Sequence, residues 1–231
     1  MTLLDVVERP VRIAVGDVLL EGDLTLPAEG RGIVVFAHGS GSSRHSPRNR
    51  LVAQLLNRAG LATLLFDLLT REEEALDQRT AGLRFDIGLL AARLAGATAW
   101  LADEVGARRF GIGYFGASTG AAAALVAAAE HPDAVSAVVS RGGRPDLAGP
   151  ALRRVRAPTL LVVGGDDHPV IHLNREALEQ LRTEKRLVIV PGATHLFQEP
   201  GTLEQVAHLA REWFERYLAP NPAPARSTGT R

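Results

Sequence analysis

The chain has 231 residues, of which 46% are hydrophobic, and it carries 26 basic and 26 acidic side chains but no cysteine. This length suits one domain with a large core, and the balanced charge disfavours nucleic acid or an anionic membrane as a partner. The lack of cysteine excludes disulfides, a thiolate nucleophile and cysteine-bound zinc.

Eight short runs of β-branched and other apolar residues are bounded by glycine, proline or charge, as β-strands are. They lie at residues 11–15, 18–26, 32–38, 61–67, 109–115, 134–140, 159–164 and 186–190. From the third run onward they are apolar almost throughout, which is typical of strands buried on both faces of a parallel sheet.

Segments with apolar residues every three or four positions separate these runs, which predicts amphipathic helices. The spacing is clearest at residues 51–56, 85–101 and 203–217, and an alanine-rich helical stretch follows Ser118. Strands that alternate with helices predict a doubly wound α/β sheet, whose functional residues follow the carboxyl ends of the strands.

Charge and proline mark two other segments. The charged run at residues 71–79 is interpreted as a solvated loop or helix face without a chemical role. The proline-rich tail at 219–231 is expected to be disordered after a single domain at 1–218.

The N-terminus has charged residues where an export signal needs an apolar stretch, and the longest apolar run, 121–129, is far shorter than the ~20 residues of a membrane span. We therefore expect a cytoplasmic protein that acts on a small molecule, with no membrane or nucleic-acid partner and an oligomeric state left open.

The stretch G-I-G-Y-F-G-A-S-T-G contains two overlapping motifs. Gly111, Gly113 and Gly116 match the dinucleotide fingerprint G-x-G-x-x-G, whereas Gly116, Ser118 and Gly120 match the nucleophile-elbow pattern G-x-S-x-G of serine hydrolases. The fingerprint needs its glycines in the turn after a strand, but the first two fall inside an apolar run. The nucleophile interpretation is therefore favoured, and no cofactor is expected.

A serine hydroxyl becomes a good nucleophile when a histidine takes its proton and a carboxylate holds that histidine. Ser118 follows the fifth predicted strand, Asp166 and Asp167 follow the seventh, and His195 follows the eighth. The order serine, acid, histidine is that of hydrolases with a nucleophile elbow. The spacing alone leaves both aspartates open as the acid.

Negative charge on a tetrahedral intermediate requires two backbone N–H donors, which form an oxyanion hole. Thr119, the residue after the nucleophile, is expected to supply one donor, and the glycine-rich turn H-G-S-G-S-S predicts Ser40 as the other. Gly116 and Gly120 are expected to be glycines for a steric reason, because a strained elbow brings the strand and the helix too close together for a side chain.

The segment R-G-G-R-P-D begins at the carboxyl end of the sixth predicted strand, near the expected site. Arg141 and Arg144 are therefore candidates for binding a carboxylate of the substrate through charge-assisted hydrogen bonds. The alternative is structural, in which one or both arginines pair with a nearby acid and fix the loop. The candidate acids are Asp67, Asp86 and Asp146.

At these motifs the chain resembles the α/β-hydrolase superfamily, and in particular its dienelactone hydrolase-like branch, over roughly residues 10–218. The resemblance rests on F-A-H-G-S-G-S-S, L-L-F-D-L-L-T, G-Y-F-G-A-S-T-G, V-V-G-G-D-D and T-H-L-F. It implies the α/β-hydrolase fold, with a mostly parallel eight-stranded sheet and no lid domain. In such hydrolases the acid commonly lies three residues after the first glycine that follows its strand, so the resemblance favours Asp167 over Asp166.

Dienelactone hydrolase itself uses a cysteine nucleophile where this chain has Ser118, so the resemblance does not carry over the lactone substrate. It implies a hydrolase of ester bonds, and we expect cleavage of small carboxylic esters through an acyl-enzyme on Ser118 without a metal or cofactor. The alternatives are a lactone hydrolase, another acyl or C–C bond hydrolase with the same residues, and a binding module whose catalytic residues are blocked.

Overall fold

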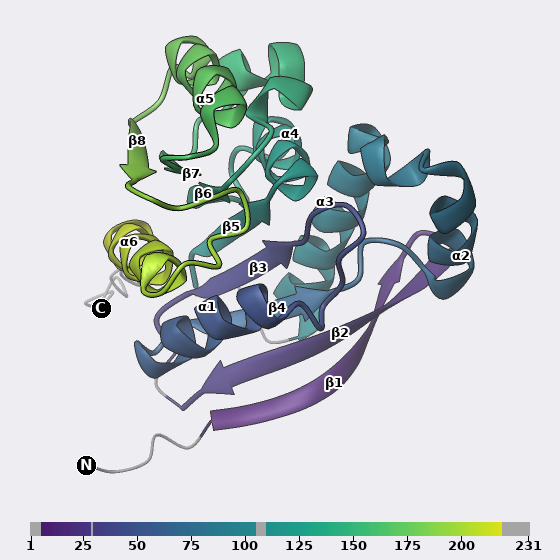
Figure 1. Ribbon diagram of the computed structural model, residues 1–231. Coiled ribbons are helices and arrows are strands. Elements are labelled where there is room, and N and C mark those ends of the chain that lie inside the picture. The colour runs from purple at the N-terminus through teal and green to yellow at the C-terminus, as the bar shows by residue number, and fades with distance from the viewer. Residues whose placement is uncertain (1–5, 29, 105–109, 219–231) are drawn as a thin grey trace, which may run out of the picture.

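The computed structural model describes residues 6–28, 30–104 and 110–218 (Figure 1). Its centre is an eight-stranded sheet with the order β1-β2-β4-β3-β5-β6-β7-β8. The strands are β1 (Val6–Val15), β2 (Val18–Pro27), β3 (Ile33–Ala37), β4 (Ala62–Phe66), β5 (Ile112–Ala117), β6 (Ala137–Arg141), β7 (Thr159–Gly164) and β8 (Lys185–Val190). β2 is antiparallel to both β1 and β4, and every pair from β4 to β8 is parallel. The predicted doubly wound, mostly parallel sheet is confirmed, and the tail predicted to be disordered lies outside the described residues.

Helices cover both faces of this sheet (Figure 1). They are α1 (Pro47–Arg58), α2 (Arg71–Thr80), α3 (Ile87–Glu104), α4 (Thr119–Glu130), α5 (His168–Gln180) and α6 (Thr202–Tyr217), with the 3-10 helices η1 (Leu83–Phe85) and η3 (Pro145–Arg154). α1 and α6 pack against one face, and α3 and α4 pack against the other. The two faces therefore bury two large, separate apolar clusters, and a small third one forms at Val163, Val170 and Ile171.

The buried strand β3 shows why its sequence is continuously apolar. Val34 and Phe36 point into the cluster under α1 and α6, whereas Ile33 and Val35 point into the cluster under α3 and α4. Because successive side chains of a strand alternate between the two faces, a strand covered on both sides must be apolar at every position. The hydroxyl of Tyr114 on β5 is satisfied inside the second cluster by Thr98 of α3, at 2.7 Å.

The charged run, expected to be a solvated loop or helix face, is helix α2, which begins at a capping box between Thr70 and Glu73. Two other local features were not expected from the sequence. Phe85 lies in η1 rather than in the following helix and is 55% exposed, because the carboxylate of Asp86 accepts the backbone N–H of Leu89 and starts α3 after it. Helix α5 was not singled out by its sequence. Its buried positions have helical spacing, but one of them is the polar Asn174, which interrupts the apolar pattern.

The parallel strands bring the residues that follow β3 to β8 to one edge of the sheet. Residues 142–158, all of them described, contain only the short η3 between β6 and β7, so no helical lid is inserted there. Among the helices of the described ranges, none is long and apolar enough to cross a membrane.

Candidate active site

Ser118 occupies a strained turn between β5 and α4. Its φ is 51° and its ψ is −121°, a backbone conformation that a residue with a Cβ rarely adopts. Two neighbouring residues hold it there: its N–H donates to the carbonyl of Arg141 at 3.3 Å, and its carbonyl accepts the N–H of Arg144 at 3.0 Å. The turn therefore presents a half-buried serine at the end of the strand, as the G-x-S-x-G pattern predicts.

The glycines around this turn are required by close contacts. A Cβ on Gly116 would lie 2.4 Å from the Cα of Ala121, and a Cβ on Gly120 would lie 2.2 Å from the carbonyl oxygen of Ala37. A Cβ on Gly39 would meet the Cβ of Ser118 at 3.0 Å. The steric role expected for Gly116 and Gly120 is thus present in the structure.

His195 follows β8, and Asp167 follows β7 as the N-cap residue of α5. Nδ1 of His195 lies 2.6 Å from Oδ2 of Asp167, and both side chains are half-buried. Asp166 is exposed, and its backbone N–H donates to the carbonyl of Ala193 at 3.0 Å. The structure therefore brings Asp167, and not Asp166, to the histidine.

The loop that carries His195 lies beside the loop that holds Ser118. A Cβ built on Gly142, the residue after Arg141, would lie 3.0 Å from the carbonyl oxygen of His195 and 3.6 Å from its Cε1. Among the described residues, no hydrogen bond joins Ser118 to His195. Such catalytic hydrogen bonds are often long until substrate binds, so the proximity of the two loops is the relevant observation.

The two predicted oxyanion residues are in direct contact. Oγ of Ser40, in the loop after β3, lies 2.9 Å from Oγ1 of Thr119. Thr119 is the first residue of α4, so its N–H has no acceptor within the helix. The hydroxyl of Ser40 also reaches the carbonyl of Arg84 at 3.4 Å, which ties this loop to η1.

The side chain of His38 holds the loop after β3, which carries Ser40, in place. Its Nε2 accepts the backbone N–H of Leu68 at 3.1 Å, which leaves Nδ1 as the donor to the carbonyl of Gly39 at 3.0 Å. Burial lowers the pKa of this imidazole below its ordinary value, so the ring is neutral at physiological pH. A buried neutral ring with both nitrogens bonded is suited to positioning Gly39 and Ser40, not to proton transfer.

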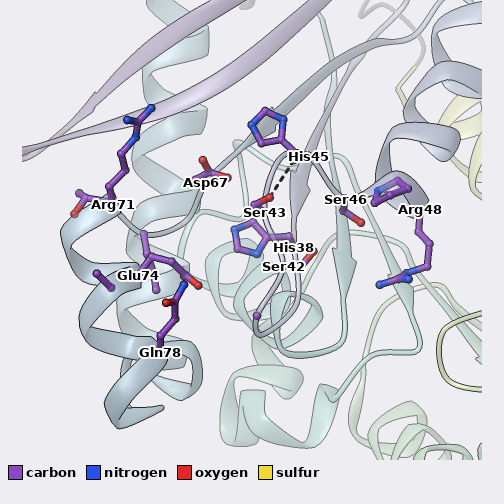
Figure 2. A pocket seen from close by; sticks show the side chains of 15 residues that line it. His38, Ser42, Ser43, His45, Ser46, Arg48, Asp67, Arg71, Glu74 and Gln78 are labelled. Carbon is purple, nitrogen blue, oxygen red and sulfur yellow. Dashed lines mark hydrogen bonds between the residues drawn. The ribbon is translucent and has the colours of Figure 1, made fainter.

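A cleft of about 550 Å³ lies between the loop after β3 and helix α2 (Figure 2). His38, Ser42 and Arg48 line one part of it, and Glu74 and Gln78 of α2 line the other. Ser118 and His195 do not line it, but Gly41 and Ser42, which follow Ser40 in the loop after β3, do. The charged run that forms α2 was expected to have no chemical role, although its place after the carboxyl end of β4 was a signal for one.

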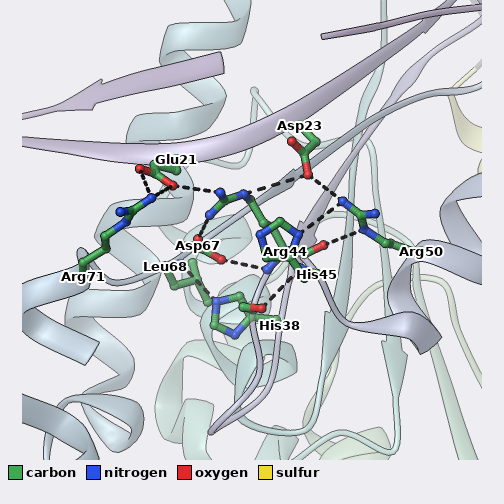
Figure 3. A network of polar contacts seen from close by, with 10 residues as sticks. Glu21, Asp23, His38, Arg44, His45, Arg50, Asp67, Leu68 and Arg71 are labelled. Carbon is green, nitrogen blue, oxygen red and sulfur yellow. Dashed lines mark hydrogen bonds and ion pairs between the residues drawn. The ribbon is translucent and has the colours of Figure 1, made fainter. Parts of the chain in front are cut away.

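Three arginines of this region form a network with acidic residues of β2 and of the end of β4 (Figure 3). Arg44 pairs with Asp67 and, at 2.8 Å, with Glu21. Arg50 lies 3.0 Å from Asp23, and Arg71 lies 2.9 Å from Glu21. The network attaches the loop after β3 to the sheet.

The two arginines predicted near substrate differ in their surroundings. Nε and Nη2 of Arg144 donate to the two carboxylate oxygens of Asp146, at 2.9 and 2.7 Å, which is the structural alternative for this residue. Arg141 is only 6% exposed, and it pairs with no acidic side chain among the described residues. The other two candidate acids are engaged elsewhere, Asp67 with Arg44 and Asp86 at the start of α3.

The sequence pattern of the Dienelactone hydrolase family matches residues 20–219. The chain belongs to the dienelactone hydrolase family. It is 64% identical to a dienelactone hydrolase from Anabaena variabilis, whose crystal structure it matches with a TM-score of 0.90 over 92% of this chain and 99% of that one. A serine hydrolase without a lid from Xanthomonas campestris shares the fold at 19% identity, with a TM-score of 0.71 over 93% of this chain and 97% of that one.

The curated relatives of this dienelactone hydrolase family member are longer. Proteins from two strains of Mycobacterium tuberculosis are 58% identical over 218 residues and carry the provisional name of phosphoribosyl transferase. The match covers 94% of this chain but 48% of theirs, so the chain spans about half the length of these relatives. The family match confirms the expected fold and family, and it supports the expected class of enzyme, a hydrolase of ester bonds.

Proposed function

We propose that this chain is a serine hydrolase that cleaves small carboxylic esters, with Ser118 as nucleophile, His195 as general base and Asp167 as the acid that orients the histidine. The observation that carries the proposal is the positive φ of Ser118, at 51°. A strained serine persists when the surrounding structure enforces it, and here three glycines and two backbone hydrogen bonds do so. The strain exposes the residue at the end of a central strand, where a nucleophile is needed.

The chemistry follows from the bond between His195 and Asp167. Because Nδ1 donates to the carboxylate, Nε2 keeps its lone pair and accepts the proton of Ser118 as its Oγ attacks the ester carbonyl. The negative oxygen of the tetrahedral intermediate is held by the backbone N–H groups of Ser40 and Thr119. The C–O bond to the alcohol then breaks, and the proton on Nε2 goes to the leaving alcohol. Water, activated by the same nitrogen, hydrolyses the acyl-enzyme and restores Ser118.

Two exposed apolar side chains flank the proposed site. Phe85 follows Arg84, whose carbonyl binds Ser40, and Leu196 follows His195. They are 55% and 38% exposed and so are accessible to a ligand. They support binding of the apolar part of an ester. The same residues would also serve lactone hydrolysis, the principal alternative.

The name of the curated relatives describes proteins about twice as long as the matched region. The region shared with them contains the serine, histidine and aspartate described above. We therefore assign the hydrolase activity to this region, and we do not propose that it transfers a phosphoribosyl group.

The test is labelling with a fluorophosphonate probe, which forms a covalent adduct with an activated serine. The folded protein should be labelled at Ser118. The fraction of p-nitrophenyl acetate turnover that is lost should equal the fraction of protein that is labelled. Ser118→Ala should abolish both signals, whereas Ser136→Ala, at the opposite end of the sheet, should retain them. Folded protein without an adduct on Ser118 would contradict the hydrolase proposal and favour a binding module. Parallel assays with an open ester and a lactone separate the two substrate classes.

A further inference from the structure

Arg141 is the last residue of β6 and lies one strand away from the proposed nucleophile. It is the register partner of Ala117, the residue before Ser118, and its carbonyl accepts the N–H of Ser118. Alternation along β6 places its side chain on the face of Ala137 and Val139, which is the face covered by α1 and α6. A guanidinium here is directed to the side of the site opposite α4.

This guanidinium is buried without an anion. Arg141 is 6% exposed, and its Nε is buried without a hydrogen-bond partner among the described residues. The central carbon of its guanidinium group, Cζ, lies 6.0 Å from the ring centre of Phe197. Burial, together with the nearby positive charge of Arg48, lowers the pKa of Arg141 to about 10. The side chain therefore remains charged at neutral pH. Burying a charge without a counter-ion is unfavourable, and such a charge calls for an explanation.

Arg48 also lacks an acidic partner among the described residues. It is half-buried in the first turn of α1, its Nε is also buried without a partner, and it forms no ion pair among the described residues. Figure 2 shows its side chain at the α1 side of the cleft, apart from Glu74 and Gln78 of α2. The first turn of α1 contains no acidic residue, so the partial positive charge of the helix N-terminus adds to that of Arg48.

The neighbouring arginines show that this isolation is selective. Arg44, Arg50 and Arg71 are all paired with carboxylates in the network of Figure 3. Arg84 pairs with Asp77, and Arg144 pairs with Asp146. Acidic residues are thus supplied to the arginines around the site, while Arg141, beside Ser118 in the sheet, and Arg48, whose charge acts on Arg141, have none among the described residues. Two cations that act on each other without an acid between them make a candidate site for an anionic group.

We propose that Arg48 and Arg141 bind a phosphate group carried by the ester substrate, while Ser118 attacks the carboxylic ester bond of the same molecule. The phosphate remains intact throughout, and no phosphoryl transfer takes place. A phosphate monoester carries a charge of about −1.5 to −2 at pH 7, which matches two guanidiniums, whereas a carboxylate would leave one of them uncompensated. This inference rests on the proposed hydrolase function and specifies its substrate class.

Binding is tested separately from catalysis, in the Ser118→Ala protein with inorganic phosphate as the probe. Phosphate affinity is measured by calorimetry, and the thermal unfolding temperature is measured with and without phosphate at constant ionic strength. Each charge-assisted hydrogen bond contributes about 1.5–3 kcal/mol, so Arg48→Gln and Arg141→Gln should each weaken phosphate binding by roughly ten- to a hundredfold. Arg58→Gln, an exposed arginine at the other end of α1, is the matched control and should bind phosphate as the parent does.

The variants also separate a ligand site from a structural role. Arg141→Gln removes an unpaired buried charge, so we expect its unfolding temperature without phosphate to be no lower than that of the parent. If Arg141→Gln does not fold, Arg48→Gln decides the outcome, because that side chain is only half-buried. Undiminished phosphate binding in Arg48→Gln, or no phosphate binding by the parent, would overturn the proposal. Equal stabilisation by acetate at the same ionic strength would overturn the assignment to a dianion and indicate a carboxylate.

A kinetic experiment compares kcat/KM for a phosphorylated ester with kcat/KM for its neutral analogue in the wild-type enzyme. The phosphorylated ester should have a kcat/KM roughly ten- to a hundredfold higher, and Arg48→Gln should bring the ratio of the two values close to one. Arg58→Gln should leave both values as they are in the wild type. Equal values for both esters in the wild type would contradict the phosphate site. Failure of the hydrolase proposal is distinguishable, because neither ester would then be turned over although phosphate binding by the Ser118→Ala protein could still be measured.

Discussion

Nδ1 of His195 lies 2.6 Å from a carboxylate oxygen of Asp167, whereas the adjacent Asp166 is exposed. This relationship predicts different effects for two chemically identical changes. Asp167→Asn should lower kcat by up to ~10⁴, because the amide cannot hold the reactive tautomer of the histidine or stabilise its charge. Asp166→Asn is the matched control and should leave kcat nearly unchanged. A large loss in the control with a mild effect at position 167 would reassign the acid.

The contact between Ser40 and Thr119 makes their side chains a coupled pair. Their hydroxyl oxygens are 2.9 Å apart, and each residue is proposed to donate its backbone N–H to the intermediate. Ser40→Ala and Thr119→Val break the same hydrogen bond but keep both N–H groups, so each should lower kcat by about tenfold at most. Residues in direct contact have non-additive effects, so the double variant should be little worse than the poorer single one. Steady-state kinetics of the four proteins provides the test, and additive losses would show that the bond does not align the donors.

The buried imidazole of His38 predicts a dependence of stability on pH. Burial lowers its pKa below the ordinary value of about 6.5, so the unfolded chain binds a proton that the folded chain does not. Stability from this residue is therefore present above about pH 6.5 and is lost as the pH falls below it, by at most about 1.4 kcal/mol per pH unit.

Urea unfolding of the wild type between pH 7.5 and 5 should show this decline in the free energy of unfolding. In His38→Asn the decline should be shallower, whatever the absolute stability of the variant. His208→Asn removes an exposed histidine, so the free energy of unfolding of this variant should fall with decreasing pH as steeply as that of the wild type. A slope that is the same in all three proteins would mean that His38 is not the group responsible.

The order of motifs was enough to predict much of this site. Residues that follow parallel strands meet at one edge of the sheet, so Ser118, His195 and an acid at position 166 or 167 could be placed together from strand positions alone. The choice of Asp167 over Asp166 depended on a family pattern, because both residues follow the same strand. The structure adds the contact that distinguishes them.

Charge pairing could not be predicted in the same way. Whether an arginine meets a carboxylate depends on side-chain directions and on loops that are distant in sequence, such as Arg44 with Glu21 and Asp67. Arg141 and Arg144 were therefore equal candidates from the sequence, although Arg144 is bound to Asp146 and Arg141 is buried without an acid among the described residues. Arg48 was missed because its position in the first turn of α1 resembles that of any surface arginine.

The ion pair of Arg144 predicts a structural role for this residue. Its side chain is 37% exposed, and bonding to Asp146 raises its pKa, as expected for a paired guanidinium. Exposed pairs contribute at most about 1 kcal/mol, so Arg144→Gln should lower the free energy of unfolding by no more than that. The ratio of kcat/KM for an anionic ester to that for its neutral analogue should not change. A marked fall in this ratio would instead place Arg144 in contact with substrate.

The connection between β6 and β7 predicts how the enzyme responds to insoluble substrates. Activation at a lipid interface requires a lid that can leave the site, but residues 142–158 contain only η3, and its residues Ala148, Ala151 and Leu152 are buried in the core. Moving η3 would expose these apolar side chains to water, at about 25 cal/mol for each Å². The rate with a long-chain p-nitrophenyl ester should therefore saturate smoothly as its concentration passes the solubility limit, as it does with the soluble butyrate ester. A jump in rate at that limit, absent with butyrate, would show that some other segment acts as a lid.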